Sequence, residues 1–374
     1  MVDWVNVFVS YRVVVLRREE IVQGVLHPEL SADAPPVRSF LEEWSDARFV
    51  RETPLGTEVT LLRRTVPRVR ERWWLHVLLF LLTLLSTTVS GALFGGWEPL
   101  RWVPASVGSW ELALPAGIFP AQLVPGLHFS LPLLAILLAH ELGHYLAARS
   151  RGMDVSPPYF IPAPLLSLIG TLGAFIRLRS PMLNRAVLLD VGAAGPIAGF
   201  LLAVPLAAAG LRHSTGGTPP YDTPTRFLVP VGGGGEGIWI GSSLLFDALS
   251  AWLAPPGEVV VLHPWAVAGW VGFFVTALNL FPLSQLDGGH ILFALAGRRQ
   301  RYAGLAFLAV LLFLGQGWVG WWIWAGLILV IGRGSVAHPP VFDPDYPVGR
   351  GRQAVGWACM AILVLTFVRV PFSL

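Results

Sequence analysis

Charge and cysteine are both scarce in this sequence. Charged residues make up 13% of the 374 residues, whereas 54% are hydrophobic, and this composition is far from that of an ordinary soluble domain. The net charge of +3 gives no indication of a nucleic-acid partner. Because Cys359 is the only cysteine, an internal disulfide bond and a cysteine-based zinc site are excluded. The composition instead indicates a membrane protein with several spans.

Long apolar runs predict the transmembrane helices, since about 20 uncharged apolar residues cross the hydrocarbon core. Arginine next to a span favours the cytoplasmic side, and arginines alternate with the runs along this sequence. We therefore expect an all-α polytopic protein with about six or seven transmembrane helices. It is expected in the plasma membrane, in direct contact with the lipid bilayer, with its N-terminus in the cytoplasm. The expected spans are residues 73–94, 126–148, 186–210, 265–282, 302–316, 318–332 and 354–370.

Four regions follow from this pattern. Residues 1–72 are polar enough for a small cytoplasmic α+β domain, with strands in "VFVSYRVVVL", "ARFVRE" and "TEVTLLRR" and a helix at 36–47. A charged lead-in at the membrane surface is the alternative. The remaining regions are 73–125 with the first transmembrane helix and an outer loop, 126–300 with the membrane core and a further helix at 239–254, and 301–374 with the C-terminal transmembrane helices.

The second expected span contains the motif His140-Glu141-Leu142-Gly143-His144. Residues four apart on an α-helix lie on one face, so both imidazoles can reach one metal ion. Glu141 stands next to the first ligand and can accept a proton from a metal-bound water. A pair of helix-packing histidines is the alternative. Ionisable groups inside a membrane span are functional by default, which favours the metal site.

A catalytic zinc ion takes three protein ligands, so this motif needs a third one from elsewhere. Pro282 and the glycines that follow break the helix in "NLFPLSQLDGGH", and Asp287 lies at that break. Asp287 is therefore the candidate third ligand, with a simple surface turn as the alternative and His290 as a competing ligand. Asn279 lies one turn deeper, where its amide can stabilise an oxyanion or bond to another helix.

Four segments in this order resemble the site-2 protease family of intramembrane zinc metalloproteases: "AHELGHYLAAR", "GTLGAFIRLRS", "AAGPIAGF" and "LNLFPLSQLDGGH". The resemblance covers about residues 127–300. The segment 211–264 is too short and too rich in proline and glycine for a PDZ domain, so the chain is most similar to the PDZ-lacking branch, which includes plastid enzymes. The resemblance implies that Zn2+ is bound by His140, His144 and Asp287, that Glu141 is the catalytic base, and that Asn279 assists substrate or oxyanion binding.

The segment "GTLGAFIRLRS" predicts a short membrane-associated β-strand. Its part "AFIRLR" alternates apolar and basic residues, and Gly170 and Gly173, which precede this part, suit a turn or bulge. Such a strand can pair with an extended substrate by edge addition, whereas a plain hairpin at the membrane surface is the alternative. The expected substrate-binding residues are Gly170, Gly173, Ala174, Phe175, Ile176 and Arg177.

The expected activity is hydrolysis of peptide bonds within or near transmembrane segments of membrane proteins. The resemblance implies either regulated intramembrane proteolysis or clearance of remnants, and an upstream site-1-type protease among the partners. Arg149 follows His144 by five residues, which places the active-site opening toward the cytoplasm. A non-proteolytic membrane metal carrier or scaffold is the alternative, but it has no use for Glu141. Membrane zinc proteases with a distant glutamate ligand are disfavoured, because no E-x-x-x-D or E-x-x-x-H signature follows His144.

Overall fold

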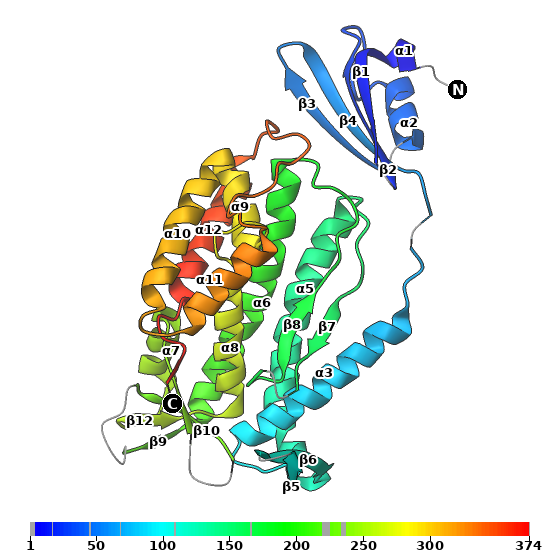
Figure 1. Cartoon of the computed structure of the whole chain (residues 1–374). Helices are drawn as coiled ribbons and strands as arrows, with labels where there is room; N and C mark the ends of the chain where they lie inside the picture. Colours follow the sequence, from blue (N-terminus) through cyan, green and yellow to red (C-terminus); the bar gives the residue numbers. More distant parts are fainter. Residues whose placement is uncertain are drawn as a thin grey trace.

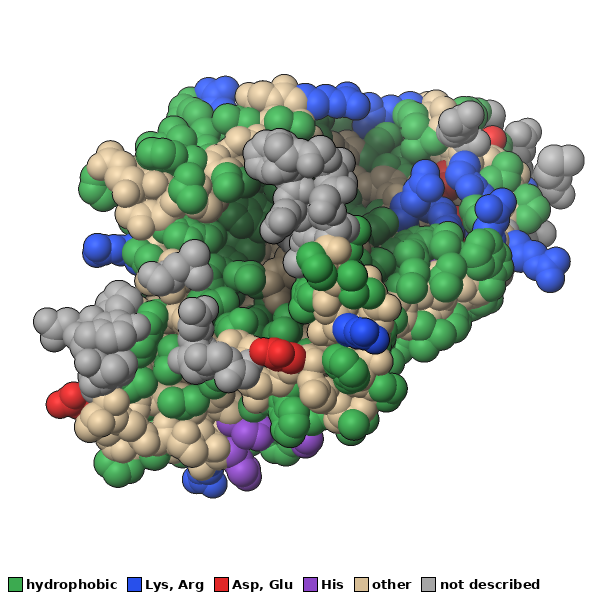
Figure 2. All heavy atoms as spheres, turned by 60° about the horizontal axis from the view of Figure 1, so that its bottom comes forward, with side chains coloured by type: hydrophobic (Ala, Val, Ile, Leu, Met, Phe, Trp, Pro, Cys, Tyr) green, Lys and Arg blue, Asp and Glu red, His purple; other side chains and the backbone are tan. Residues whose placement is uncertain are grey.

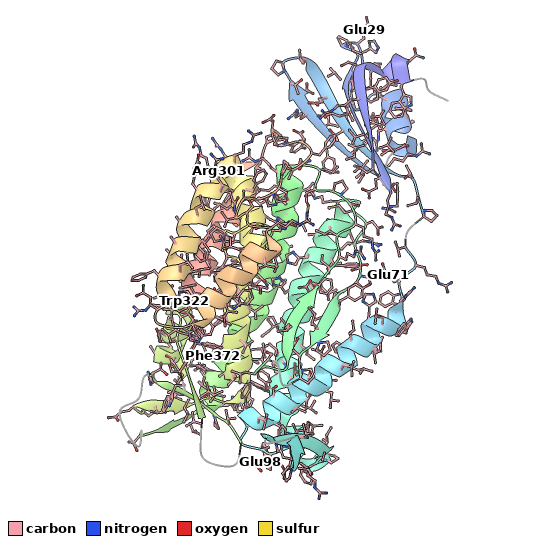
Figure 3. All side chains as sticks on the ribbon, viewed as in Figure 1. Glu29, Glu71, Glu98, Arg301, Trp322 and Phe372 are labelled. Carbon is pink, nitrogen blue, oxygen red and sulfur yellow. The ribbon has the colours of Figure 1, made fainter. Side chains whose placement is uncertain are left out.

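The computed structural model combines a helical bundle with a sheet beside its upper end and smaller sheets at its lower end (Figure 1). Figure 3 places Arg301 at the upper end of the bundle, Glu71 near the middle of the view beside the start of α3 (Trp73–Phe94), and Glu98 at the lower end. The structure describes residues 4–16, 18–44, 46–67, 69–107, 110–164, 167–218, 225–232 and 237–373.

The N-terminal sheet has four antiparallel strands in the order β1-β2-β4-β3, with one apolar cluster between the sheet and α2. Three strands and the helix lie where the sequence predicts them. β2 is the exception, because it is the strand between β1 and β4 and is buried along most of its length, so it lacks the alternation that marks a half-buried strand. The elements are α1 (Trp4–Val7), β1 (Phe8–Val15), β2 (Glu19–Leu26), α2 (Pro35–Trp44), β3 (Ala47–Thr53) and β4 (Gly56–Arg64).

Three helices in the described residues are at least 18 residues long and apolar enough to cross a membrane. They are α3 (Trp73–Phe94), α5 (Leu127–Ser150) and α6 (Arg185–His213). The short helix α4 (Pro120–Leu123) and one 3-10 turn lead directly into α5. Hydrophobic side chains cover much of the face seen in Figure 2, while arginines gather along its upper edge and around the N-terminal sheet. This distribution is typical of a lipid-facing surface with a basic rim.

The remaining helices are shorter than a full membrane crossing. Four of them coincide with the later expected spans, but each has 12 to 17 residues. The expected helix at 239–254 begins later than predicted, as α7. These helices are α7 (Leu244–Leu253), α8 (Pro264–Asn279), α9 (Asp287–Ala296), α10 (Gln300–Leu314), α11 (Gly320–Ile331) and α12 (Arg350–Thr366).

The all-α fold class expected for the membrane part leaves out several strands that the structure contains. The expected outer loop contains a hairpin, and a five-stranded sheet in the order β13-β11-β10-β12-β9 lies at the lower end of the bundle. Strands of two to four residues are too short to produce a readable period in a sequence. The additional strands are β5 (Leu100–Val107), β6 (Trp110–Ile118), β9 (Thr215–Gly217), β10 (Phe227–Pro230), β11 (Gly237–Ile240), β12 (Val259–Val261) and β13 (Phe372–Ser373).

Candidate metal centre and active site

The two histidines of α5 face the same point inside the bundle. His140 and His144 are both buried, and their Nε2 atoms lie 3.0 Å apart. The spacing of four residues on a continuous helix produces this arrangement, because four residues return to nearly the same face. The sequence prediction that both imidazoles reach one point therefore agrees with the geometry.

Asp287 joins the two histidines from a different part of the chain. Its Oδ2 lies 3.3 Å from His140 Nε2 and 3.2 Å from His144 Nε2. It is the first residue of α9, after the irregular segment that follows α8. Two glycines hold it there, since a Cβ on Gly288 would overlap Leu280 O and one on Gly289 would overlap Ser284 O. The tight turn before α9 thus aims the carboxylate at the α5 histidines.

The three donor atoms fit one zinc ion. Donors held about 2.0–2.1 Å from a tetrahedral zinc ion lie roughly 3.3–3.4 Å from one another, close to the 3.0, 3.3 and 3.2 Å found here. His144 Nδ1 donates to the carbonyl oxygen of Val191 at 2.7 Å, which leaves the Nε2 lone pair directed at the cluster. Within the described residues, these three side chains form the one group with metal-ligand spacing.

Helix α6 makes room for the two histidines through glycines with the same spacing. A Cβ on Gly195 would overlap the ring of His144, and a Cβ on Gly199 would lie 3.2 Å from Cβ of His140. The sequence indicated only close helix packing for this pair. The relation of this pair to the candidate metal centre was not predicted from the sequence. The equal spacing of four residues between the two glycines and between the two histidines could have indicated that they face each other.

Glu141 and Asn279 both lie beside the cluster. Glu141 is 7% exposed, and its carboxylate interacts with the backbone of Ile176. Asn279 ends α8, and its Nδ2 is 3.3 Å from His140 Nε2. A carboxylate and an amide therefore flank the three donor atoms, from α5 and α8 respectively, at positions suited to a proton acceptor and a hydrogen-bond donor.

The predicted substrate strand is present but ends earlier than expected. β8 (Thr171–Phe175) pairs with β7 (Tyr159–Pro162) and lies alongside α5 (Figure 1). Ile176 and Arg177 lie beyond the strand, because β7 begins at Tyr159, which pairs with Phe175 at the end of β8. The alternation over "AFIRLR" is therefore not that of a continuous strand, and Leu178 instead forms an isolated bridge with Val155.

Glycines shape this hairpin as predicted. Gly170 has a φ of +77°, and a Cβ there would overlap the backbone of α3 at Ser86, whose Oγ donates to Gly170 O at 2.7 Å. Gly173 has a φ of +99° inside β8, and Ala174 and Phe175 complete the strand. Among the described residues, β7 is the only strand that pairs with β8. The other edge of β8 lies on the α5 side, which is the side of the metal centre.

Two other polar residues in this region have partners of their own. His290, the competing ligand, directs its Nδ1 to His338 Nε2 at 2.6 Å. Asp190 in α6 forms ion pairs with Arg151 and Arg352. Neither belongs to the group formed with Asp287, so the donor set stays at two histidines and one aspartate.

Comparison with known proteins agrees with this geometry. The model of peptidase family M50 matches residues 128–315. The chain is 31% identical to the "Probable zinc metalloprotease EGY1, chloroplastic" of Arabidopsis thaliana over 83% of this chain and 56% of that protein. It is 30% identical to the rice (Oryza sativa subsp. japonica) protein of the same name over 82% of this chain and 53% of that one. The chain thus spans about half the length of these curated relatives. No solved structure matches it.

Proposed function

The chain belongs to peptidase family M50, and we propose that it is an intramembrane zinc metalloprotease. Its reaction is the hydrolysis of peptide bonds within or near transmembrane segments of membrane proteins. The observation that carries this proposal is the triangle of His140, His144 and Asp287 donor atoms with Glu141 beside it, on a helix long enough to cross a membrane. Membrane spans contain ionisable groups where they serve a function.

His140, His144 and Asp287 would hold the zinc ion. A bound zinc ion supplies Lewis acidity toward a water molecule and toward the carbonyl group that is attacked. Glu141 accepts the proton of the attacking water and then delivers it to the leaving amine. The Asn279 amide donates a hydrogen bond to the oxyanion that develops on the substrate carbonyl. Burial of Glu141 and partial burial of Asn279 strengthen these interactions by limiting contact with bulk water.

The substrate is proposed to lie along the free edge of β8. A transmembrane helix must unwind before its peptide bonds can be attacked, and the β8 edge offers the extended segment new backbone partners. Gly173, Ala174 and Phe175 belong to this strand, Gly170 directly precedes it, and the backbone of Ile176, which follows it, lies near Glu141. The short hairpin beside α5 supports this placement.

We also propose six or seven spans, with the shorter helices α8, α10, α11 and α12 completing the bundle around α3, α5 and α6. The N-terminal α+β region, residues 1–72, and the active-site opening are placed on the cytoplasmic side of the plasma membrane. The arginine distribution along the chain supports this orientation. An upstream site-1-type protease is the proposed partner that would prepare substrates.

The test is a comparison of the wild type with Glu141→Gln in lipid vesicles. Both proteins should contain about one zinc ion per chain, and the variant should cleave a model transmembrane substrate about 10²-fold more slowly or worse. Glu29→Gln, an exposed change in the N-terminal region, is the matched control and should behave like the wild type. A wild type that binds zinc but never cleaves would favour the membrane metal carrier instead.

A further inference from the structure

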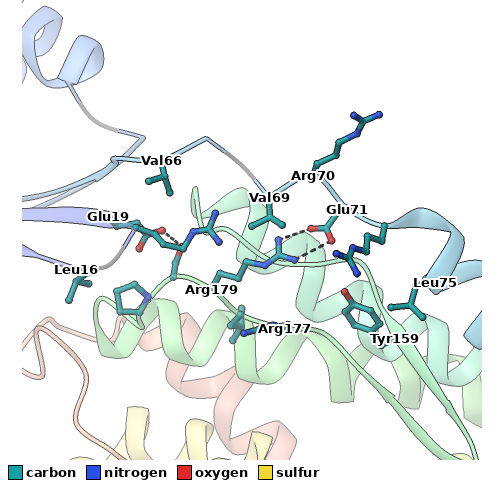
Figure 4. Close-up of a pocket in the computed structure, with 15 residues that line it drawn as sticks. Leu16, Glu19, Val66, Val69, Arg70, Glu71, Leu75, Tyr159, Arg177 and Arg179 are labelled. Carbon is teal, nitrogen blue, oxygen red and sulfur yellow. Dashed lines mark hydrogen bonds and ion pairs between the residues drawn. The ribbon is translucent and has the colours of Figure 1, made fainter.

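A cavity of about 1030 Å³ lies where three parts of the chain meet (Figure 4). The turn between β1 and β2 forms one wall with Leu16, Arg18 and Glu19. The linker before α3 forms a second wall from Val66 onward, and residues 177–181 form the third. The N-terminal sheet, the first membrane helix and the segment that follows the substrate strand therefore share one space.

Arginine outnumbers acidic side chains in this cavity. Of its two acidic groups, Glu71 forms an ion pair, while the Oε2 atom of Glu19 has no hydrogen-bond partner among the described residues. Arg179 binds Glu71 with both Nη atoms, at 2.6 and 3.1 Å, as Figure 4 shows. This contact lowers the pKa of Glu71, so the carboxylate stays ionised and paired with Arg179. Glu19 is buried, and its Oε1 accepts a hydrogen bond from Ser180 Oγ. The lining arginines are Arg18, Arg70, Arg72, Arg177 and Arg179.

Several guanidinium groups remain without a carboxylate. In the described part of the chain, neither Arg72 nor Arg177 forms an ion pair, and both are exposed. Among the described residues, the side chain of Arg18 donates to Pro67 O at 3.3 Å and its buried Nε has no partner. Arg70 extends outward from the linker at the rim (Figure 4). The cavity can therefore accept carboxylate groups, for which the guanidinium fork is the matched donor.

The cavity continues directly from the proposed active site. The backbone of Ile176 interacts with the Glu141 carboxylate, and the next residue, Arg177, already lines the cavity. An extended chain advances roughly 3.3 Å per residue, so residues 177–181 form a track away from the attacked bond. Tyr159, at the start of β7, lies in the same wall and packs on His76 near the beginning of α3. A substrate strand along β8 thus brings its flanking residues into the cavity.

Building on the proposed protease function, the geometry points to the substrate class: membrane proteins whose cytoplasmic flank, within a few residues of the transmembrane segment, is acidic. Most membrane proteins carry lysine or arginine at this place. The unpaired arginines repel such flanks and attract acidic ones, so the cavity discriminates by charge in both directions. Apolar side chains from Leu16, Val66 and Leu75 supply contacts for the rest of the flank.

The experiment measures binding before cleavage. The Glu141→Gln full-length chain in phosphatidylcholine vesicles is titrated with model substrates that share one transmembrane segment and carry three glutamates, three glutamines or three lysines in the flank. We expect about tenfold tighter binding of the glutamate form than of the glutamine form, as for a few partly exposed ion pairs. The difference should shrink in high salt. Cleavage by the wild type should show the same order in KM, with kcat little changed.

Variants locate the effect. Arg72→Gln and Arg177→Gln should each reduce the preference for the glutamate flank, and Arg177→Glu should shift it toward the lysine flank. Arg301→Gln, an exposed change on α10, is the control and should keep the preference. Tighter binding of the lysine-flank substrate by Arg177→Glu than by the unsubstituted chain is a result that misfolding cannot produce.

Other outcomes overturn the inference. Equal binding of the glutamate and glutamine flanks contradicts it, as does an equal loss of preference in Arg301→Gln. If the flanks bind equally while Arg72→Gln and Arg177→Gln lose binding to vesicles with phosphatidylglycerol, the cavity holds a lipid headgroup instead. If no substrate is cleaved but the flank preference in binding remains, the proposed protease function fails and the charge selection stands.

Discussion

At the scale of single residues, the candidate metal centre depends on two glycines that leave room for the side chains of its histidines. Gly195 and Gly199 of α6 oppose His144 and His140 of α5. The two helices run in opposite directions through this contact, so each glycine meets one histidine. A methyl group on Gly195 would occupy the space of the His144 ring. The Nδ1 atom of that ring donates to Val191 O, which lies on the same helix as Gly195. The position of the His144 ring therefore depends on this hydrogen bond and on the absence of a side chain at Gly195.

Gly195→Ala should consequently weaken zinc binding without unfolding the helix. Alanine favours a helix over glycine by about 1 kcal/mol, and the His144 ring can swing aside, so we expect a folded protein. A displaced ring no longer meets the metal-ligand distance tolerance, and zinc affinity should fall about 10- to 100-fold. Zinc content by mass spectrometry after competition with a chelator measures this. Gly326→Ala, where a Cβ meets open space, should keep the wild-type affinity, and an unchanged affinity in Gly195→Ala would contradict the role assigned to the gap.

At the scale of helices and strands, the sequence predicts what has a long period or a fixed spacing. The runs that become α3, α5 and α6 are long and apolar, and the His140–His144 spacing follows from one helix. The position of Asp287 at the start of a new helix could be predicted, because proline and glycine residues mark the break between the two helices. The end of β8 could not, because it depends on the partner strand β7, which begins at Tyr159 and pairs that residue with Phe175.

The strands at the lower end of the bundle show a second limit. β9, β10, β12 and β13 have two to four residues each, and β13 comes from the last residues of the chain to pair with β11. Neighbours so far apart in sequence leave no local pattern. β2 is long enough to show a pattern, but it was not predicted. It is buried on both faces, which removes the alternation of apolar and polar residues that marks a surface strand.

The linker before α3 is fastened to the segment after β8 by one ion pair, and its strength should depend on pH. Arg179 lowers the pKa of Glu71 below the ordinary value of 4.5, so the pair stabilises the fold fully above about pH 4.5 and is lost as the pH falls through the lower folded-state pKa. Both side chains are mostly buried, with exposed fractions of 11% and 16%. Glu71→Gln should then cost about 1.5–3 kcal/mol at pH 7 and less at a low pH, below the lowered pKa of Glu71.

Thermal unfolding of metal-free wild type and Glu71→Gln at both pH values measures this difference. Metal-free protein is used because zinc binding has a pH dependence of its own. The exposed change Glu29→Gln provides the comparison for loss of one negative charge and should have little effect at either pH. If Glu71→Gln lowers the thermal stability by the same amount at low pH as at pH 7, packing and not the ion pair holds the linker in place.

At the scale of the whole molecule, the metal centre joins parts of the chain that are far apart in sequence. α5 supplies two donor atoms, and α9 supplies the third after the chain has passed through α6, the lower sheet and α8. The N-terminal sheet in turn contacts the membrane core, with Arg51 Nη1 3.1 Å from Asp343 Oδ1. A zinc ion in the triangle would therefore tie the first half of the bundle to the second.

Zinc should accordingly raise the thermal stability of the entire bundle, and this effect should require Asp287. A ligand that binds only the folded state stabilises it by RT ln(1 + [L]/Kd), about 2.7 kcal/mol at a concentration of 100 Kd. We expect the apparent Tm of the wild type to rise by several degrees when zinc is added to chelator-treated protein. Asp287→Ala should lose most of this rise, while the exposed Asp345→Ala should retain it. Because metal-free Asp287→Ala keeps both α5 histidines, a full zinc response in this variant would show that α9 contributes no ligand and that the bundle is not joined through the metal.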